Sequence, residues 1–232
     1  MSQRNLTCQT FDRRAFLAGI AASGALAAGG PAWAVACPRP GAREIAFDIQ
    51  REGVSIGRHE VRFSRAGDLL EVDVDIDIVV NFAFIPVFRY RHRNHEAWRD
   101  GRLIALDSET DDDGTAYSVS VRQQAAGLRV SAAEGAFLAP ADILPTSYWN
   151  PATIAQTRLL DSQHGRLLEV RPAFLGEEPL AEAVARRYRL SGDLNLDLWY
   201  AKDEWVKIAF EARGAEVSYA RRDLGLDGGA SG

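Results

Sequence analysis

Cysteine is almost absent from this chain, which limits both its covalent stabilisation and its chemistry. The 232 residues contain two cysteines, Cys8 and Cys37, and one methionine. Cys8 falls in an N-terminal segment that has the features of a cleaved export signal, so the mature chain keeps one thiol and cannot form an internal disulfide. Its stability must therefore come from side-chain packing and hydrogen bonding.

An excess of positive charge and long apolar runs are also missing. The chain has 27 Lys and Arg against 32 Asp and Glu, a net charge of −5, and removal of residues 1–36 changes this to −7. Because an acidic surface repels phosphate backbones, we expect no nucleic-acid partner. From Cys37 onward no apolar run approaches the roughly 20 residues of a membrane-spanning helix, so we expect no transmembrane span.

Motifs for common catalytic and cofactor sites are missing as well. The sequence has no Gly-x-Ser-x-Gly elbow, no His-Glu-x-x-His motif, no Cys–His pair and no Gly-rich phosphate loop. Asp161, Ser162 and His164 stand close together in the chain, but triad members usually converge from separate segments, and the following Gly165 favours a hairpin tip. We therefore predict a protein without enzymatic activity, cofactor or metal.

The N-terminus, in contrast, carries a recognisable export signal. Arg13 and Arg14, followed by Phe16 and Leu17, resemble the twin-arginine pattern of bacterial Tat substrates, and an uncharged stretch rich in Ala and Gly comes next. We expect the Tat translocase to export the protein to the periplasm and residues 1–36 to be removed.

Cleavage after residue 36 would leave Cys37 as the first mature residue, and two fates remain open for it. The surrounding sequence resembles a weak lipobox, so Cys37 could carry a lipid that anchors the protein in the envelope. Residues 37–41 would then form a short, stiff, Pro-rich linker. In the alternative, the signal is simply trimmed and Cys37 stays a free thiol.

From residue 42 onward, apolar and polar residues alternate in short runs separated by Gly and Asp turns, which is typical of strands. The pair Asn150-Pro151 predicts one short helix, ending near Thr157. More than ten antiparallel strands cannot remain one flat sheet. We predict an all-β fold over residues 42–222, with a single antiparallel, strongly curved sheet that closes into a barrel or half-open clam, and a disordered tail at 223–232.

Two neighbouring runs of this pattern carry opposite charges on one face. Residues 69–80 alternate apolar residues with acidic ones, and the next run alternates apolar residues with arginines. A hairpin in which Asp77 meets Arg89 matches both faces, so we interpret the charges as a solvated stripe that fixes the register. The other predicted pairs are Asp75–Arg91, Asp73–Arg93, Ile78–Phe88 and Ile76–Tyr90.

The stretch "YRHRNHEAW" in the second run holds two of the four histidines. His92 and His95 are three residues apart, and on a strand this spacing directs them to opposite faces, so they cannot chelate one metal ion. The inward-facing polar group around His92 belongs either to a core network or to a ligand site. The residues that share its face are Tyr90, Asn94, Glu96 and Trp98.

Several of these segments together resemble a known family. The motifs are Glu96-x-Trp98 with Gly101, Ser147-Tyr148-Trp149-Asn150 and Leu198-Trp199-Tyr200. They are similar to a family of bacterial exported proteins defined only by a domain of unknown function, number 6134, and more distantly to a second group, number 3108. The resemblance implies an exported single β domain and no established activity; the distant group implies a curved sheet similar to lipoprotein carriers.

The sequence thus leads to the hypothesis of a periplasmic β-barrel or clam that binds or carries an apolar or amphipathic small molecule, such as a lipid. One alternative is a non-enzymatic structural or interaction protein of the envelope with a filled core, and a hydrolase-like enzyme is the third candidate. The candidate ligand-binding residues are Tyr90, His92, Glu96, Trp98, Trp149 and Trp199.

Overall fold

The structure is a computed structural model that describes residues 43–82, 84–181 and 183–222. The predicted export signal (1–36), linker (37–41) and tail (223–232) lie outside the described residues. The chain divides into two units, residues 1–34 and 35–232, and everything described belongs to the second. Within the described ranges, no helix is long and apolar enough to cross a membrane.

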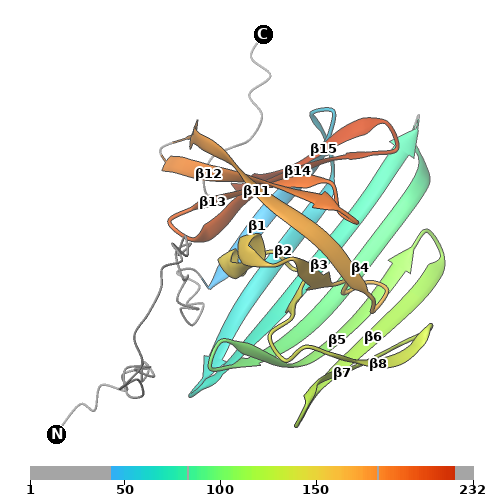
Figure 1. Cartoon of the computed structure of the whole chain (residues 1–232). Coiled ribbons are helices and arrows are strands. Elements are labelled where there is room, and N and C mark those ends of the chain that lie inside the picture. Colours follow the sequence, from blue (N-terminus) through green and yellow to red (C-terminus); the bar gives the residue numbers. More distant parts are fainter. Residues whose placement is uncertain (1–42, 83, 182, 223–232) are drawn as a thin grey trace, which may run out of the picture. The chain divides into compact units, whose positions relative to one another are not determined.

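The described chain forms one large sheet, so the predicted all-β class is confirmed (Figure 1). Consecutive strands pair with one another from β1 to β8 and again from β9 to β15, and β1 joins the two series by pairing with β15. The strands are β1 (Glu44–Arg51), β2 (Val54–Ala66), β3 (Leu69–Phe82), β4 (Ile85–Arg99), β5 (Arg102–Asp112), β6 (Thr115–Gln124), β7 (Gly127–Ala132), β8 (Gly135–Ala139), β9 (Leu144–Pro145), β10 (Arg158–Leu160), β11 (Leu167–Leu180), β12 (Ala183–Gly192), β13 (Leu196–Ala201), β14 (Glu204–Ala212) and β15 (Ala215–Arg221).

The sheet is not closed by hydrogen bonds, because β8 and β9 are its two edges. The half-open form of the predicted fold therefore describes it better than a closed barrel. One pair also departs from the antiparallel prediction, since β9 and β10 are parallel. These two strands are joined by a crossing segment, residues 146–157, and a crossover of this length permits parallel pairing where a hairpin does not.

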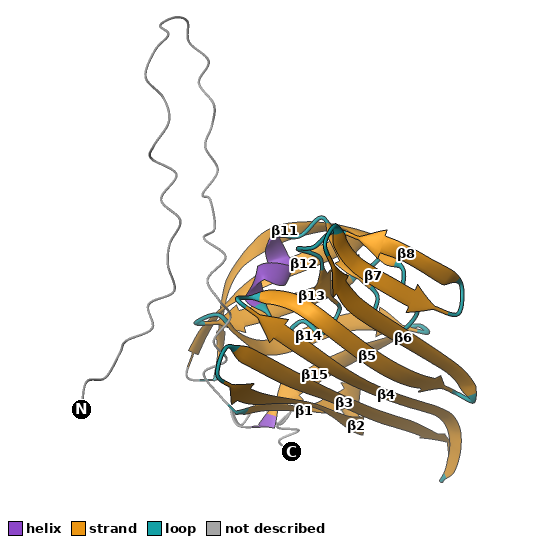
Figure 2. Ribbon diagram, turned by 90° about the horizontal axis from the view of Figure 1, so that it is seen from below, coloured by secondary structure: helices purple, strands orange, loops and turns teal. Residues whose placement is uncertain are grey.

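The crossing segment carries a helical turn, the 3₁₀ helix η1 (Pro151–Ala155). The Asn150 side chain accepts a hydrogen bond from the Ala152 N–H at 3.0 Å, and Pro151 needs no N–H partner at the first position. The turn is thus capped as predicted, although it is 3₁₀ rather than α and ends before Thr157. Figures 1 and 2 show the sheet wrapping around this segment.

The hairpin of β3 and β4 pairs acidic residues with basic ones as expected, but its register differs from the prediction. Asp77 lies opposite Arg91 and Asp75 opposite Arg93, a displacement of two residues. Strand pairing continues as far as Phe82 and Ile85, with a bulge at Val80 and Asn81 that the prediction did not include. Because a shift of two keeps every side chain on its face, the charged and apolar faces still match. The observed inner pairs are Ile78–Tyr90 and Ile76–His92.

The main hydrophobic core lies on the inner face of the sheet, where it follows the alternation of the sequence. A second, smaller cluster lies on the outer face of β12 to β14, around Trp199. The largest side chains in the main core that are fully buried are Phe47, Ile49, Trp98, Leu103, Leu106, Leu128, Leu159, Leu160, Leu190, Leu198 and Trp205.

Candidate functional site

A row of paired residues crosses the inner face of four neighbouring strands. His59 on β2 lies opposite Ile76 on β3, which lies opposite His92 on β4, which in turn lies opposite Thr110 on β5. Directly opposed residues share one face of a sheet, so all four side chains point inward. The two histidines are 3% and 4% exposed, which places two ionisable rings in the interior.

His92 has a partner for each of its ring nitrogens. Its Nδ1 lies 2.7 Å from Thr110 Oγ1, and its Nε2 lies 3.4 Å from Oγ of Ser162. Burial lowers the pKa of His92 to about 4, against an opposing effect of Asp161, so the ring is neutral at pH 7. The neutral ring can donate through one nitrogen and accept through the other. It thereby holds the turn between β10 and β11 against the sheet.

The contact between Ser162 and His92 joins two distant segments and resembles part of a catalytic triad. Its third member, however, is the hydroxyl of Thr110 rather than a carboxylate, and a base with a pKa near 4 is weak at neutral pH. Ser162 Oγ also lies 3.2 Å from Thr146 Oγ1, and the N–H of Ser162 donates to that same oxygen. The arrangement is better suited to fixing the turn than to activating a nucleophile.

The turn at residues 161–166 is organised by Asp161, which confirms the predicted hairpin tip. One carboxylate oxygen accepts from the N–H groups of Gln163 and His164, at 2.9 and 3.2 Å. The other lies 2.8 Å from His164 Nδ1 and 3.2 Å from Arg166 Nε. Across the described ranges, no group of three or more His, Cys, Asp or Glu is placed to hold a metal ion.

Glu96 is the centre of a second buried network, next to His92 on β4. Its Oε2 accepts from the indole nitrogens of Trp98 and Trp149, at 2.8 and 3.0 Å, and its Oε1 accepts from Asn94 Nδ2 at 2.7 Å. Complete burial raises the pKa of Glu96, and hydrogen bonds led by those from Trp149 and Ser147 oppose this rise. Because Trp149 belongs to the crossing segment, the network ties that segment to the sheet.

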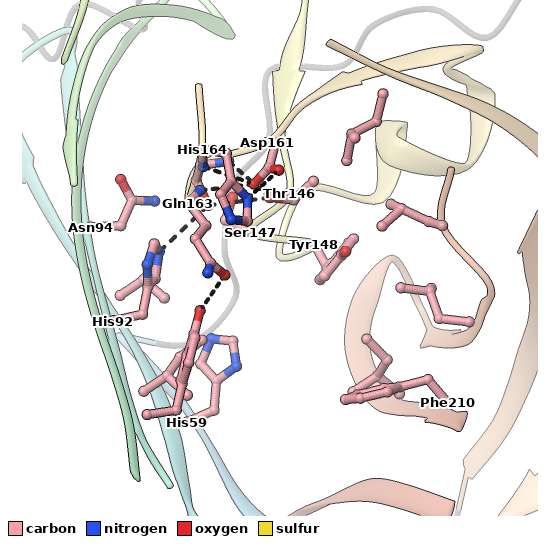
Figure 3. Close-up of a pocket in the computed structure, with 18 of the residues that line it drawn as sticks. His59, His92, Asn94, Thr146, Ser147, Tyr148, Asp161, Gln163, His164 and Phe210 are labelled. Atoms are coloured by element: carbon pink, nitrogen blue, oxygen red, sulfur yellow. Dashed lines mark hydrogen bonds and ion pairs between the residues drawn. The ribbon is translucent and has the colours of Figure 1, made fainter. Parts of the chain in front are cut away.

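A cavity of about 420 Å³ opens between the crossing segment, the 161–166 turn and the facing strands (Figure 3). The exposed lining residues Arg166, Asp193 and Asn195 mark the side on which it meets solvent. Its other polar lining residues are His59, Tyr90, His92, Asn94, Thr146, Ser147, Asp161, Ser162, Gln163 and His164. Its apolar and aromatic lining residues are Val74, Ile76, Tyr148, Leu168, Leu194, Leu196, Ile208, Phe210 and Tyr219.

Two polar side chains of the cavity wall are buried without a full set of partners. Both ring nitrogens of His59 and the Oδ1 of Asn94 have no hydrogen-bond partner among the described residues. Burial, with a smaller effect of His92, lowers the pKa of His59 to about 3. Buried polar groups are normally satisfied. The hydroxyls of Thr153 and Tyr188 also lack a partner among the described residues, but neither residue lines the cavity.

The six residues predicted as a ligand site separate into three places. Tyr90 and His92 line the cavity, and the Tyr90 hydroxyl donates to Gln163 Oε1 at 3.1 Å. Glu96, Trp98 and Trp149 do not line it, because they form the buried network beside it.

Trp199 lies on the outer face of the sheet, so the expectation that it lines the cavity is wrong. Its neighbours Leu198 and Tyr200 take the inward positions of the alternation. The Trp199 ring instead packs under the cations of Arg187 and Lys207, at 4.9 and 4.7 Å from its centroid.

Sequence reasoning did not single out His59, and it considered Ser162 only together with Asp161 and His164. His59 precedes Val61 by two residues in the same alternating run, so its inward direction was available from the pattern. The approach of Ser162 to His92 was not, because it depends on the turn between β10 and β11 folding back onto β4.

Comparisons with known proteins agree with this fold. The model of a family described as a domain of unknown function, DUF6134, matches residues 47–222, so the predicted resemblance is confirmed. A crystal structure of a beta-barrel-like protein of domain of unknown function DUF1849 from Brucella abortus is similar, with 8% identity and a TM-score of 0.56, covering 77% of this chain and 94% of that one. At that identity the similarity concerns the fold alone. No curated protein matches, and the more distant resemblance to group 3108 stays a prediction.

Proposed function

The chain belongs to the DUF6134 family, and from its site we propose that it binds or carries a small apolar or amphipathic molecule. The observation that carries this proposal is the cavity of about 420 Å³, within the range of small-molecule pockets. Most of the hydroxyl and amide groups of the lining belong to β4, the start of the crossing segment and the 161–166 turn, whereas β3 and β14 contribute aliphatic and aromatic groups such as Ile76, Ile208 and Phe210 (Figure 3). Such a division suits a ligand that has a polar part and an apolar part.

The test is whether the purified protein holds such a molecule and whether a side chain can block it. We expect organic extraction to release a lipid-like compound, and the neutral dye N-phenyl-1-naphthylamine to become fluorescent in the cavity. Leu194→Trp should reduce dye binding several-fold, because Leu194 lines the cavity near its exposed side. Val184→Trp, at a position that is 60% exposed, is the control and should have no effect. A protein that releases nothing and excludes the dye would refute the proposal.

A role as an interaction protein is the second candidate, and one observation favours it. Phe84, Ile85 and Val87, at the tip of the β3–β4 hairpin, are 100%, 66% and 54% exposed. Such an apolar tip is suited to contact with another molecule. Replacing all three with Ser should abolish capture of an envelope partner and leave dye binding unchanged if this candidate is correct.

For the location we propose export by the Tat route to the periplasm, with lipid anchoring through Cys37 as the alternative. Arg13 and Arg14 support the route. Their replacement by Lys should leave precursor in the cytoplasm, and unaffected export would refute the route. Membrane fractionation of the Cys37→Ser variant distinguishes a lipid-anchored protein from a free one.

A further inference from the structure

Among the described residues of the cavity wall, His59 is the buried polar side chain that the fold leaves without any hydrogen bond, whereas Asn94 keeps one. Neither ring nitrogen has a partner among the described residues, and the ring is 3% exposed. The rings packed around it belong to Phe47, Trp205 and Tyr219, with centroids at 6.1, 5.2 and 5.6 Å. An apolar side chain would pack in this place without the cost of a polar group that has lost its water. Packing alone therefore does not account for a histidine at this position.

The charge of this part of the cavity limits what His59 could bind. Its low pKa keeps the ring neutral at pH 7, with one N–H donor and one acceptor nitrogen. The charged lining residues that are exposed, Arg166 and Asp193, lie on the solvent side instead. Asp161, the buried carboxylate of the lining, is already paired with His164 and Arg166. A charged head group next to His59 would lose its hydration without gaining a counter-ion.

We infer that His59 is the hydrogen-bonding anchor for an uncharged head group, such as a hydroxyl, of an otherwise apolar ligand. This inference rests on the proposed function and adds the chemical class of the ligand. A hydroxyl both donates and accepts, so it can complete one or both of the bonds that His59 lacks. The apolar remainder of the ligand then lies against Ile76, Ile208 and Phe210, which line the same cavity.

The test compares four probes that share one chain and differ in the head group: decan-1-ol, decanoate, decylammonium and decane. Isothermal titration calorimetry of the purified protein at pH 7.5 should give the tightest binding for decan-1-ol. We expect decane to bind about 10-fold more weakly, and decanoate and decylammonium more weakly still. His59→Leu should reduce the affinity for decan-1-ol to that for decane and leave decane unaffected.

Two further variants keep the result interpretable. His59→Gln retains a donor and an acceptor and should restore part of the preference for the alcohol. His95→Leu removes an exposed histidine from the opposite face of β4, where its ring pairs with Asp73, and should change no affinity. Thermal unfolding of each variant establishes that it is folded.

The possible failures separate this inference from the proposed function. Decanoate binding as tightly as the alcohol, or alcohol binding that His59→Leu does not alter, would overturn the role of His59 and leave a ligand-binding cavity in place. If none of the four probes binds and the dye is excluded as well, the proposed function itself is wrong.

Discussion

His59 and His92 stand in one row of the same sheet, separated by one residue of β3, and yet they occupy opposite situations. The ring of His92 meets a hydroxyl at each nitrogen, whereas the ring of His59 packs against aromatic rings and has no hydrogen-bond partner among the described residues. Both are buried and both have lowered pKa values. The two rings therefore differ in the number of hydrogen-bond partners that the fold supplies, and this difference, rather than burial or the pKa, supports the binding role proposed for His59.

The largest expected effect on stability comes from the buried hydrogen-bond network of Glu96, which lies on β4 beside His92. Glu96→Leu removes the acceptor of two indole N–H groups and of Asn94, and each unsatisfied buried donor costs about 1–3 kcal/mol. We expect the free energy of unfolding, measured with urea, to fall by about 3 kcal/mol or more.

Glu96→Gln is the matched control for this change. Gln keeps one oxygen for the two indoles, and the amide of Asn94, whose Oδ1 has no partner among the described residues, can turn to accept from the new NH₂ group. Its loss should be about 1 kcal/mol. Equal losses for Gln and Leu would show that the hydrogen bonds to Glu96 do not stabilise the fold.

Acid should destabilise the protein through both histidines. Their pKa values are about 3 and about 4 in the folded state and about 6.5 when unfolded, so the unfolded state binds more protons between pH 6.5 and 4. Stability should therefore fall as the pH is lowered through this range, by about 2 kcal/mol per histidine between pH 7 and pH 5. His59→Leu and His92→Leu should each reduce this loss in urea unfolding at the two pH values. A pH dependence identical to that of the parent would contradict the burial of that ring.

The same two variants compared at pH 7 give the sharpest contrast, and His59→Leu is the change with the smallest expected effect on stability. His92→Leu leaves the hydroxyls of Thr110 and Ser162 without the ring and should cost about 2 kcal/mol. His59→Leu loses no hydrogen bond and should be neutral or stabilising by up to about 1 kcal/mol. Differential scanning calorimetry would measure both changes. A large loss for His59→Leu would mean that the ring stabilises the fold and is not held ready for a ligand.

Alternation in the sequence was sufficient to predict the strands and the inward face of β4. His92, Glu96 and Trp98 lie on the predicted face because strand geometry fixes this by parity alone. The same rule assigns His59 to the inward face and Trp199 to the outward face, so the alternation was also sufficient to include His59 in the site and to exclude Trp199 from it.

The alternation could not predict the contacts between segments that are distant in the sequence. The register of the β3–β4 hairpin depends on a bulge close to its tip, which the side-chain pattern does not specify. The positions of Trp149 and Ser162 depend on how the crossing segment and the 161–166 turn fold back into the curved sheet. Such contacts follow from packing in three dimensions and produce no periodic pattern of apolar and polar residues in the sequence.

The pairing of β1 with β15 separates this sheet from a simple meander. Phe47 pairs with Arg221 across nearly the whole described chain, whereas every other pair of strands joins neighbours in sequence. Closing so long a loop has a high entropic cost, and contacts between distant segments form slowly. Both series of strands can therefore form by local hairpins before β1 pairs with β15. We expect the seam between the first and last strands to be completed last in folding, whereas the two free edges, β8 and β9, lie in mid-chain.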